Sequence, residues 1–172
     1  MKTFFILSLP RSRSAWLANF LTYENSFCFH EALIDNDPID LPELFKSTGK
    51  EIVGNSDCGN ALFLDEILNT FQDTRLVIVH RPIDEVFMSL DKMGPLFSER
   101  ENVMSAKNKI DVISKTCKHL SVDFHDMSVN VCKSIWGYCI GSEFDSQRWR
   151  MLDGISMEII QEKKISQLEG FH

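Results

Sequence analysis

Short apolar runs alternate along this chain with segments in which hydrophobic residues recur at helical spacing. Residues 4–9 and 75–80 form the two clearest runs, and such runs are typical of central parallel strands buried on both faces. Weaker strand patterns occupy residues 27–30, 51–55 and 120–125. Helical patterns fill most of the intervals between and after the strands, at residues 15–21, 60–71, 82–90, 102–119, 127–139, 144–152 and 155–165.

This alternation predicts the fold class. It indicates an α/β fold with helices packed on a mainly parallel central sheet. The 172 residues suffice for one ordinary domain with a substantial core and are too few for two, so we expect a single domain over residues 1–172. Residues 35–42 are acidic and contain two prolines, and we expect a loop there, with a second loop over residues 94–101.

Charge and composition narrow the classes of partner. The net charge of −7 argues against nucleic acid, because a phosphate backbone needs a basic surface. No run approaches the roughly 18 apolar residues of a membrane span. The first apolar run is too short for a secretion signal and is stopped by Pro10. Five cysteines without CxxC spacing are expected to be reduced thiols of a cytoplasmic protein.

The loop after the first strand carries a dense set of anion-binding groups. Arg11, Ser12, Arg13 and Ser14 follow the strand, and Ala15 opens the helix. Free N–H groups at a helix start favour an anion, and guanidinium groups grip phosphate or sulfate oxygens in pairs. The residues alone leave open a simpler interpretation, an N-capped helix with solvated arginines. The GxxxxGK[ST] motif is absent, which disfavours ordinary kinase chemistry.

A second candidate anion site follows the other clear strand. Arg81 ends that strand, and Ser89 lies on the next helix, which Pro82 opens. Ligands of parallel α/β sheets bind beyond the carboxyl ends of the strands, so we expect the two arginine-bearing segments near one site. The alternative is structural, with Arg81 in an ion pair with Asp84 or Glu85.

Together these segments resemble the P-loop-related sulfotransferases. Residues 5–17 look like the strand, loop and helix with which that family holds the 5′-phosphosulfate, and residues 76–90 look like its 3′-phosphate segment. Residues 122–127 and 144–149 are more weakly similar to later segments. The resemblance implies a three-layer α/β/α, P-loop NTPase-like fold of the sulfotransferase type. Two features depart from the family: Arg13 stands where glycine is common, and no glycine-rich basic segment lies near the C-terminus.

The resemblance also implies a reaction. The donor would be 3′-phosphoadenosine 5′-phosphosulfate, the product adenosine 3′,5′-bisphosphate (3′,5′-ADP), and the acceptor a hydroxyl or amine of a small molecule or carbohydrate. Arg11 would stabilise charge on the leaving phosphate, and arginine would take the place of a metal. Arg81 and Ser89 would bind the 3′-phosphate. The 5′ end would be bound by five successive residues: Arg11, Ser12, Arg13, Ser14 and Ala15.

A general base is needed to deprotonate the acceptor. Glu31 and His30 directly follow the second predicted strand. Some bacterial members of the family are similar in placing a glutamate at that strand end, so we favour Glu31, with His30 as the other candidate. Histidine titrates near neutrality unaided, whereas a glutamate needs burial to raise its pKa. The simpler interpretation is that Glu31 begins a helix and complements its dipole.

Three further residues have two interpretations each. Trp16 is expected in the helix core, with an adenine-facing role as the alternative. Arg148 and Trp149 either contact the cofactor region or belong to a packed amphipathic helix.

Two alternative functions also stay open: a nucleotide kinase-like phosphotransferase, and a non-catalytic nucleotide-binding module on the same fold.

Overall fold

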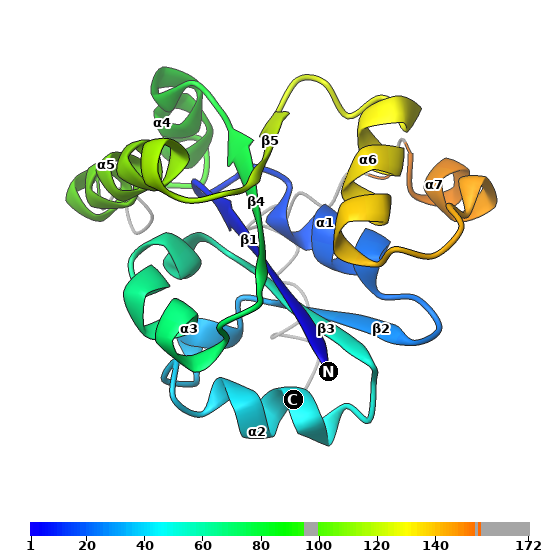
Figure 1. The fold of residues 1–172 in the computed structure, drawn as a ribbon. Coiled ribbons are helices and arrows are strands. Elements are labelled where there is room, and N and C mark those ends of the chain that lie inside the picture. The colour runs from blue at the N-terminus through cyan, green and yellow to red at the C-terminus, as the bar shows by residue number, and fades with distance from the viewer. Residues whose placement is uncertain (95–99, 154, 156–172) are drawn as a thin grey trace, which may run out of the picture.

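The computed structural model describes residues 1–94, 100–153 and 155. A sheet of five parallel strands lies at its centre, in the order β2-β3-β1-β4-β5 (Figure 1). The strand bounds are β1 (Lys2–Ser8), β2 (Ser26–His30), β3 (Ile52–Asp57), β4 (Arg75–His80) and β5 (Leu120–Asp123).

The central strand β1 is buried along nearly its whole length, which explains its continuous apolar sequence. Its side chains alternate between two cores. Phe4 and Ile6 pack into the core on one face of the sheet, and Phe5 and Leu7 into the core on the other. Gly54 on β3 lies opposite Phe4, and a Cβ there would come within 2.2 Å of the Phe4 ring, so this position requires glycine.

Helices cover both faces, as Figure 1 shows. The face of Phe4 and Ile6 carries α1 (Ser14–Leu21), α6 (Val129–Cys139) and α7 (Ser146–Leu152). The opposite face carries α2 (Leu41–Ser47), α3 (Leu64–Thr70), α4 (Ile83–Asp91) and α5 (Arg100–Thr116), with the short 3-10 helices η1 (Ala32–Ile34) and η2 (Cys58–Ala61). The structure therefore confirms an α/β fold with a parallel sheet between helices.

Three expectations about local structure differ from the structure. The predicted loop over residues 35–42 contains the start of α2, because Pro42 occupies a first-turn position that a helix tolerates. The predicted helix over residues 60–71 is divided into the end of η2 and α3. Of the helix expected over residues 155–165, residue 155 is not helical and the remainder lies outside the described residues.

The connections after β1 and β4 determine where a ligand would bind. The chain leaves β1 toward α1 on one face of the sheet, and it leaves β4 toward α4 on the other. These strands are neighbours in the sheet. In open α/β sheets, ligands bind at the carboxyl ends of neighbouring strands whose connections diverge in this way. Pro10–Arg13 and Arg81 lie at this switch point.

Candidate functional site

The loop between β1 and α1 has a tightly turned backbone. Arg11 and Arg13 have φ angles of 64° and 66°, in the left-handed region that non-glycine residues seldom occupy. Ser12 between them is fully buried, and its hydroxyl donates to the Pro10 carbonyl at 3.4 Å. The hydroxyl therefore turns inward, while the loop places both arginine side chains on the outside. No side chain caps the start of α1 at Ser14.

The second predicted segment meets this loop directly. An Arg81 guanidinium N–H donates to the Arg11 carbonyl, and Arg11 Nε donates to Ser89 Oγ at 3.3 Å. These contacts join residues 70 and 78 positions apart in the sequence. The structure thus brings Arg11, Arg81 and Ser89 together, and it pairs Ser89 with Arg11 rather than with Arg81.

An acidic and an aromatic side chain hold Arg81 in place. Its side chain is only 13% exposed, and its Nε lies 3.5 Å from Glu85 Oε2. The guanidinium also lies over the Phe124 ring, 4.0 Å from the centroid, and Arg13 approaches the same ring at 5.3 Å. The ion pair with Glu85 is the structural alternative considered for Arg81, and it occurs together with the contact to the loop between β1 and α1.

His125 extends this chain of contacts. Its Nε2 lies 2.9 Å from Glu85 Oε1, so Glu85 bridges Arg81 and His125. Sequence reasoning assigned no role to Phe124 or His125. Both follow β5, so the rule that directed attention to the ends of β1 and β4 would also have found them.

Three like charges meet in this arginine cluster, which we define as Arg11, Arg13 and Arg81. Burial lowers the pKa of the Arg81 guanidinium, and repulsion from Arg11 and Arg13 lowers it further, while Glu85 opposes both effects. Glu85 is the carboxylate that pairs with Arg81. A bound anion would relieve the repulsion among the three guanidinium groups.

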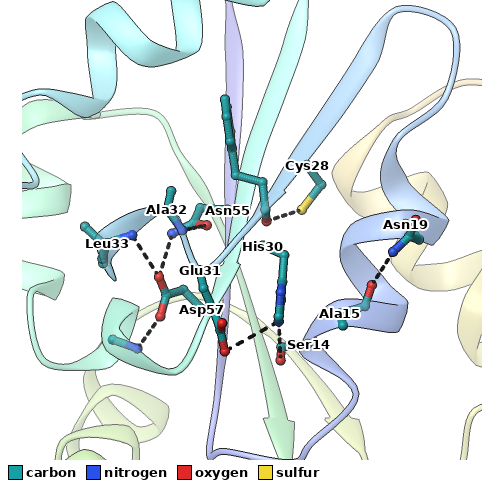
Figure 2. A network of polar contacts seen from close by, with 12 residues as sticks. Ser14, Ala15, Asn19, Cys28, His30, Glu31, Ala32, Leu33, Asn55 and Asp57 are labelled. Atoms are coloured by element: carbon teal, nitrogen blue, oxygen red, sulfur yellow. Dashed lines mark hydrogen bonds and ion pairs between the residues drawn. The ribbon is translucent and has the colours of Figure 1, made fainter. Parts of the chain in front are cut away.

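The two candidate bases stand beside the same loop (Figure 2). His30 is the last residue of β2, and its Nε2 lies 3.1 Å from Ser14 Oγ, at the start of α1. The same nitrogen lies 3.6 Å from Glu31 Oε1. Glu31, His30 and Ser14 therefore form a continuous polar row that reaches from the end of β2 to the loop between β1 and α1.

A buried amide network fixes the turn that contains Glu31. Glu31 has a φ of 60°, and the next two backbone N–H groups, of Ala32 and Leu33, donate to Asn55 Oδ1 at 3.2 Å and Asp57 Oδ2 at 3.0 Å (Figure 2). Asp57 also accepts from the Gly59 N–H, and Asn60 donates to the carbonyls of Ile6 and Asn55. The position of Glu31 is therefore set by buried groups of β3 and η2. This network had no counterpart in the sequence analysis.

Of the other expected residues, Trp16 and Arg148 lie away from the cluster, and Ala15 directly follows the loop. Trp16 is buried, stacks on Phe20 at 5.0 Å and donates to the Leu152 carbonyl, which confirms the core position. Arg148 donates to the carbonyls of Asn19, Phe20 and Thr22 at the end of α1, so it caps that helix instead of reaching the arginine cluster. Ala15 occupies the first turn of α1, where its carbonyl accepts from Asn19.

No protein-family model matches the chain, and no curated protein matches it significantly. Across residues 1–94, 100–153 and 155, no helix is both long and apolar enough to cross a membrane. Over the same residues, no three His, Cys, Asp or Glu side chains are grouped as metal ligands, and all five cysteines are unpaired thiols.

Proposed function

We propose that this chain binds 3′-phosphoadenosine 5′-phosphosulfate and transfers its sulfuryl group to an acceptor hydroxyl or amine. The observation that carries the proposal is the convergence of Arg11, Arg13 and Arg81 at the switch point of the sheet, where Glu85 pairs with Arg81. The strand order and the loop after β1 fit the P-loop NTPase-like fold that the sequence resemblance implies. That fold assignment is part of the proposal.

The residues present suit a ligand that is anionic at two ends. Arg11, Arg13, Ser14 and the N–H groups of the loop and of Ala15 would hold the 5′-phosphosulfate. Because its hydroxyl is turned inward, Ser12 would contribute through its backbone. Arg81 and Ser89 would hold the 3′-phosphate, with Ser89 exchanging its contact with Arg11 for the ligand.

The donor supplies an activated sulfuryl group, and the chain supplies charge and position. Arg11 lies where it would stabilise negative charge as it develops on the leaving phosphate. The proton of the acceptor would pass to Glu31 or His30, and His30 contacts both Glu31 and Ser14. Fixed groups of this kind act mainly by positioning and electrostatics, as in phosphoryl transfer.

Selective binding of the bisphosphate product is the first test. We expect 3′,5′-ADP to raise the melting temperature of the protein more than AMP or ATP does, since a ligand at 100 times its Kd adds about 2.7 kcal/mol. Arg81→Ala should weaken 3′,5′-ADP binding about 100-fold, because a half-buried charged contact is lost. Arg150→Ala, at an exposed arginine of α7, is the matched control and should bind normally.

The remaining outcomes separate the alternatives. Equal responses to all three nucleotides, in wild type and Arg81→Ala alike, would refute the donor site. Stabilisation by ATP with magnesium alone would favour kinase-like chemistry. Selective binding of 3′,5′-ADP without transfer of labelled sulfate from the donor to any acceptor would favour a non-catalytic binding module.

The choice of base is tested by two matched variants. Glu31→Gln and His30→Gln preserve size and remove the proton-accepting group. We expect Glu31→Gln to lower kcat by about 10²–10⁴-fold at unchanged 3′,5′-ADP affinity. If instead His30→Gln has that effect and Glu31→Gln a smaller one, His30 is the base and Glu31 orients its ring.

A further inference from the structure

An apolar cavity adjoins the arginine cluster on the side of the sheet covered by α5. Its volume is about 500 Å³, within the range of roughly 300–1,000 Å³ that small-molecule sites have. Most of the described residues that line it are apolar, and they come from η1, η2, the segment before α3, and α5. The apolar lining residues from these elements are Leu33, Ile34, Leu62, Phe63, Val103 and Ala106.

The cavity begins where the proposed donor site ends. Pro10 lines it and is followed directly by Arg11, and Leu90 lines it and is preceded directly by Ser89. None of the three arginines of the cluster lines the cavity. The candidate base Glu31 precedes the η1 residues whose side chains form one wall. A molecule in the cavity would therefore lie beside the donor site without occupying it.

The described residues of the cavity wall contribute three polar side chains, those of Asp57, Cys58 and Asn102. The carboxylate of Asp57 already accepts from the backbone N–H groups of Leu33 and Gly59, at 3.0 and 2.7 Å. Burial raises the pKa of the Cys58 thiol to about 11, and the charges of Asp57 and Glu31 add to this, so Cys58 is a neutral thiol at physiological pH. Asp57 is the one charged side chain among the described lining residues.

Apolar side chains continue to the outer part of the cavity. Ile34 is 69% exposed and Phe63 is 40% exposed, although both line it. Large apolar residues at an accessible surface beside a cavity are characteristic of a binding site for an apolar ligand. A carbohydrate in this cavity would lose its hydrogen bonds to water and would gain few from the cavity wall. Several of its polar groups would therefore stay unpaired, at a cost in binding free energy.

We infer that the cavity receives the acceptor, and that the acceptor is an uncharged apolar alcohol or phenol rather than a carbohydrate; this inference rests on the proposed function. In the reaction, the acceptor oxygen forms a bond to sulfur, and the bond from sulfur to the bridging phosphate oxygen breaks. The hydroxyl proton passes to Glu31 or His30, and 3′,5′-ADP leaves. Atoms and charge balance without a further reactant.

The test measures binding of 1-hydroxypyrene, a fluorescent apolar phenol, to the protein with saturating 3′,5′-ADP. Ala106→Phe places a ring in the cavity and should weaken 1-hydroxypyrene binding at least 10-fold while leaving 3′,5′-ADP binding intact. Val112→Phe is the matched control, on the same helix α5 at a position 59% exposed, and should bind 1-hydroxypyrene normally. Phe63→Gln, at an exposed lining position, provides a second variant if Ala106→Phe fails to fold, and should weaken binding several-fold.

Each outcome decides the inference. Absence of 1-hydroxypyrene binding, equal binding by wild type, Ala106→Phe and Phe63→Gln, or tighter binding of glucosamine than of 1-hydroxypyrene would overturn it. Failure of the donor assignment gives a different pattern. In that case the wild type would not bind 3′,5′-ADP, yet 1-hydroxypyrene binding in the absence of nucleotide would still be lost in Ala106→Phe, and the cavity would remain an apolar ligand site.

Discussion

Two polar networks lie at the carboxyl edge of the same sheet and differ in how their groups are balanced. Beside β1 and β4, three arginines lie together, and Glu85 pairs with one of them, Arg81. Beside β3, the side chains of Asn55, Asp57 and Asn60 bond to one another and to backbone groups. The first network brings three like charges together, whereas the buried side chains of the second use their donors and acceptors internally.

This difference distinguishes binding from support. A buried network whose groups are paired internally stabilises the fold, and a ligand finds few partners in it. In a cluster of like charges, mutual repulsion raises the free energy of the unliganded protein, and an anion that binds between the charges relieves this repulsion. The β3 network should therefore control stability, and the arginine cluster should control anion affinity.

The largest effect is expected from disrupting the β3 network. Asn60→Ala removes hydrogen bonds of 2.9 to 3.0 Å to Ile6 and Asn55 inside the protein. We expect the free energy of unfolding to fall by about 3 kcal/mol and the melting temperature by roughly 6–12 °C. Affinity for 3′,5′-ADP, measured well below the melting temperature, should change less than twofold.

Asn130→Ala, at an exposed position of α6, is the control and should leave the melting temperature unchanged. The comparison of the two networks would break down if Asn60→Ala left stability intact and reduced nucleotide affinity tenfold or more.

A smaller effect is expected from the aromatic support of the arginines. Phe124→Leu retains apolar volume but removes the ring that Arg81 and Arg13 face. A cation–π contact of this kind contributes about 1 kcal/mol, so we expect 3′,5′-ADP affinity to fall about five- to tenfold by titration calorimetry. Phe87→Leu removes the corresponding contact with Arg100, at 4.7 Å, and should not alter affinity. Equal affinities of the two variants would mean that Phe124 does not orient the cluster.

The left-handed backbone at Arg13 allows stability and binding to be separated. Arg13→Gly relieves a conformation that costs a side-chain-bearing residue about 1 kcal/mol, so we expect the melting temperature to rise slightly. The same change removes a guanidinium and should weaken 3′,5′-ADP binding several-fold. Glu24→Gly, at another left-handed position, φ 41°, should give a similar rise with no change in affinity. A simultaneous loss of stability in Arg13→Gly would contradict the strain argument.

Much of the fold was predictable because the local sequence of the central strands is sufficient to identify them. The apolar sequences of β1 and β4 reflect burial on both faces of the sheet. Arg11 and Arg81 follow these strands, and an α/β fold does not itself require arginine at either position. The helix α2 was missed because its acidic, proline-containing start is also typical of loops, and packing of Leu41 and Phe45 decides between the two.

The pairing of residues within the site was less predictable, because it depends on contacts across the chain. The sequence indicated that Arg11, Arg81 and Ser89 meet, but local spacing carried no sign that Ser89 accepts from Arg11. The link from Arg81 through Glu85 to His125 joins α4 to the end of β5, 40 residues from Glu85 to His125. Arg148 likewise caps α1 from more than 120 residues away, where sequence spacing carries no signal.

The smallest expected effect concerns His80, the last residue of β4 and the neighbour of Arg81. Burial lowers the pKa of His80 below its ordinary value of 6.5, and His119 and Lys107 lower it further, while Asp111 and Asp123 oppose the shift. The unfolded chain therefore binds this proton at a higher pH than the folded protein. The stability contributed by the neutral ring is complete above the unfolded-state pKa of about 6.5 and is lost as the pH falls through the folded-state pKa.

Urea unfolding between pH 8 and pH 5 measures this effect. The wild type should lose stability toward the acid end, and His80→Gln, which cannot be protonated, should show a shallower decline over the same interval. Parallel declines in the wild type and His80→Gln would show that the acid sensitivity arises elsewhere. A shallower decline in His80→Gln would identify His80, the neighbour of Arg81 in the sequence, as one of the titrating groups. Proton uptake by His80 would then add to the positive charge that an anion would balance.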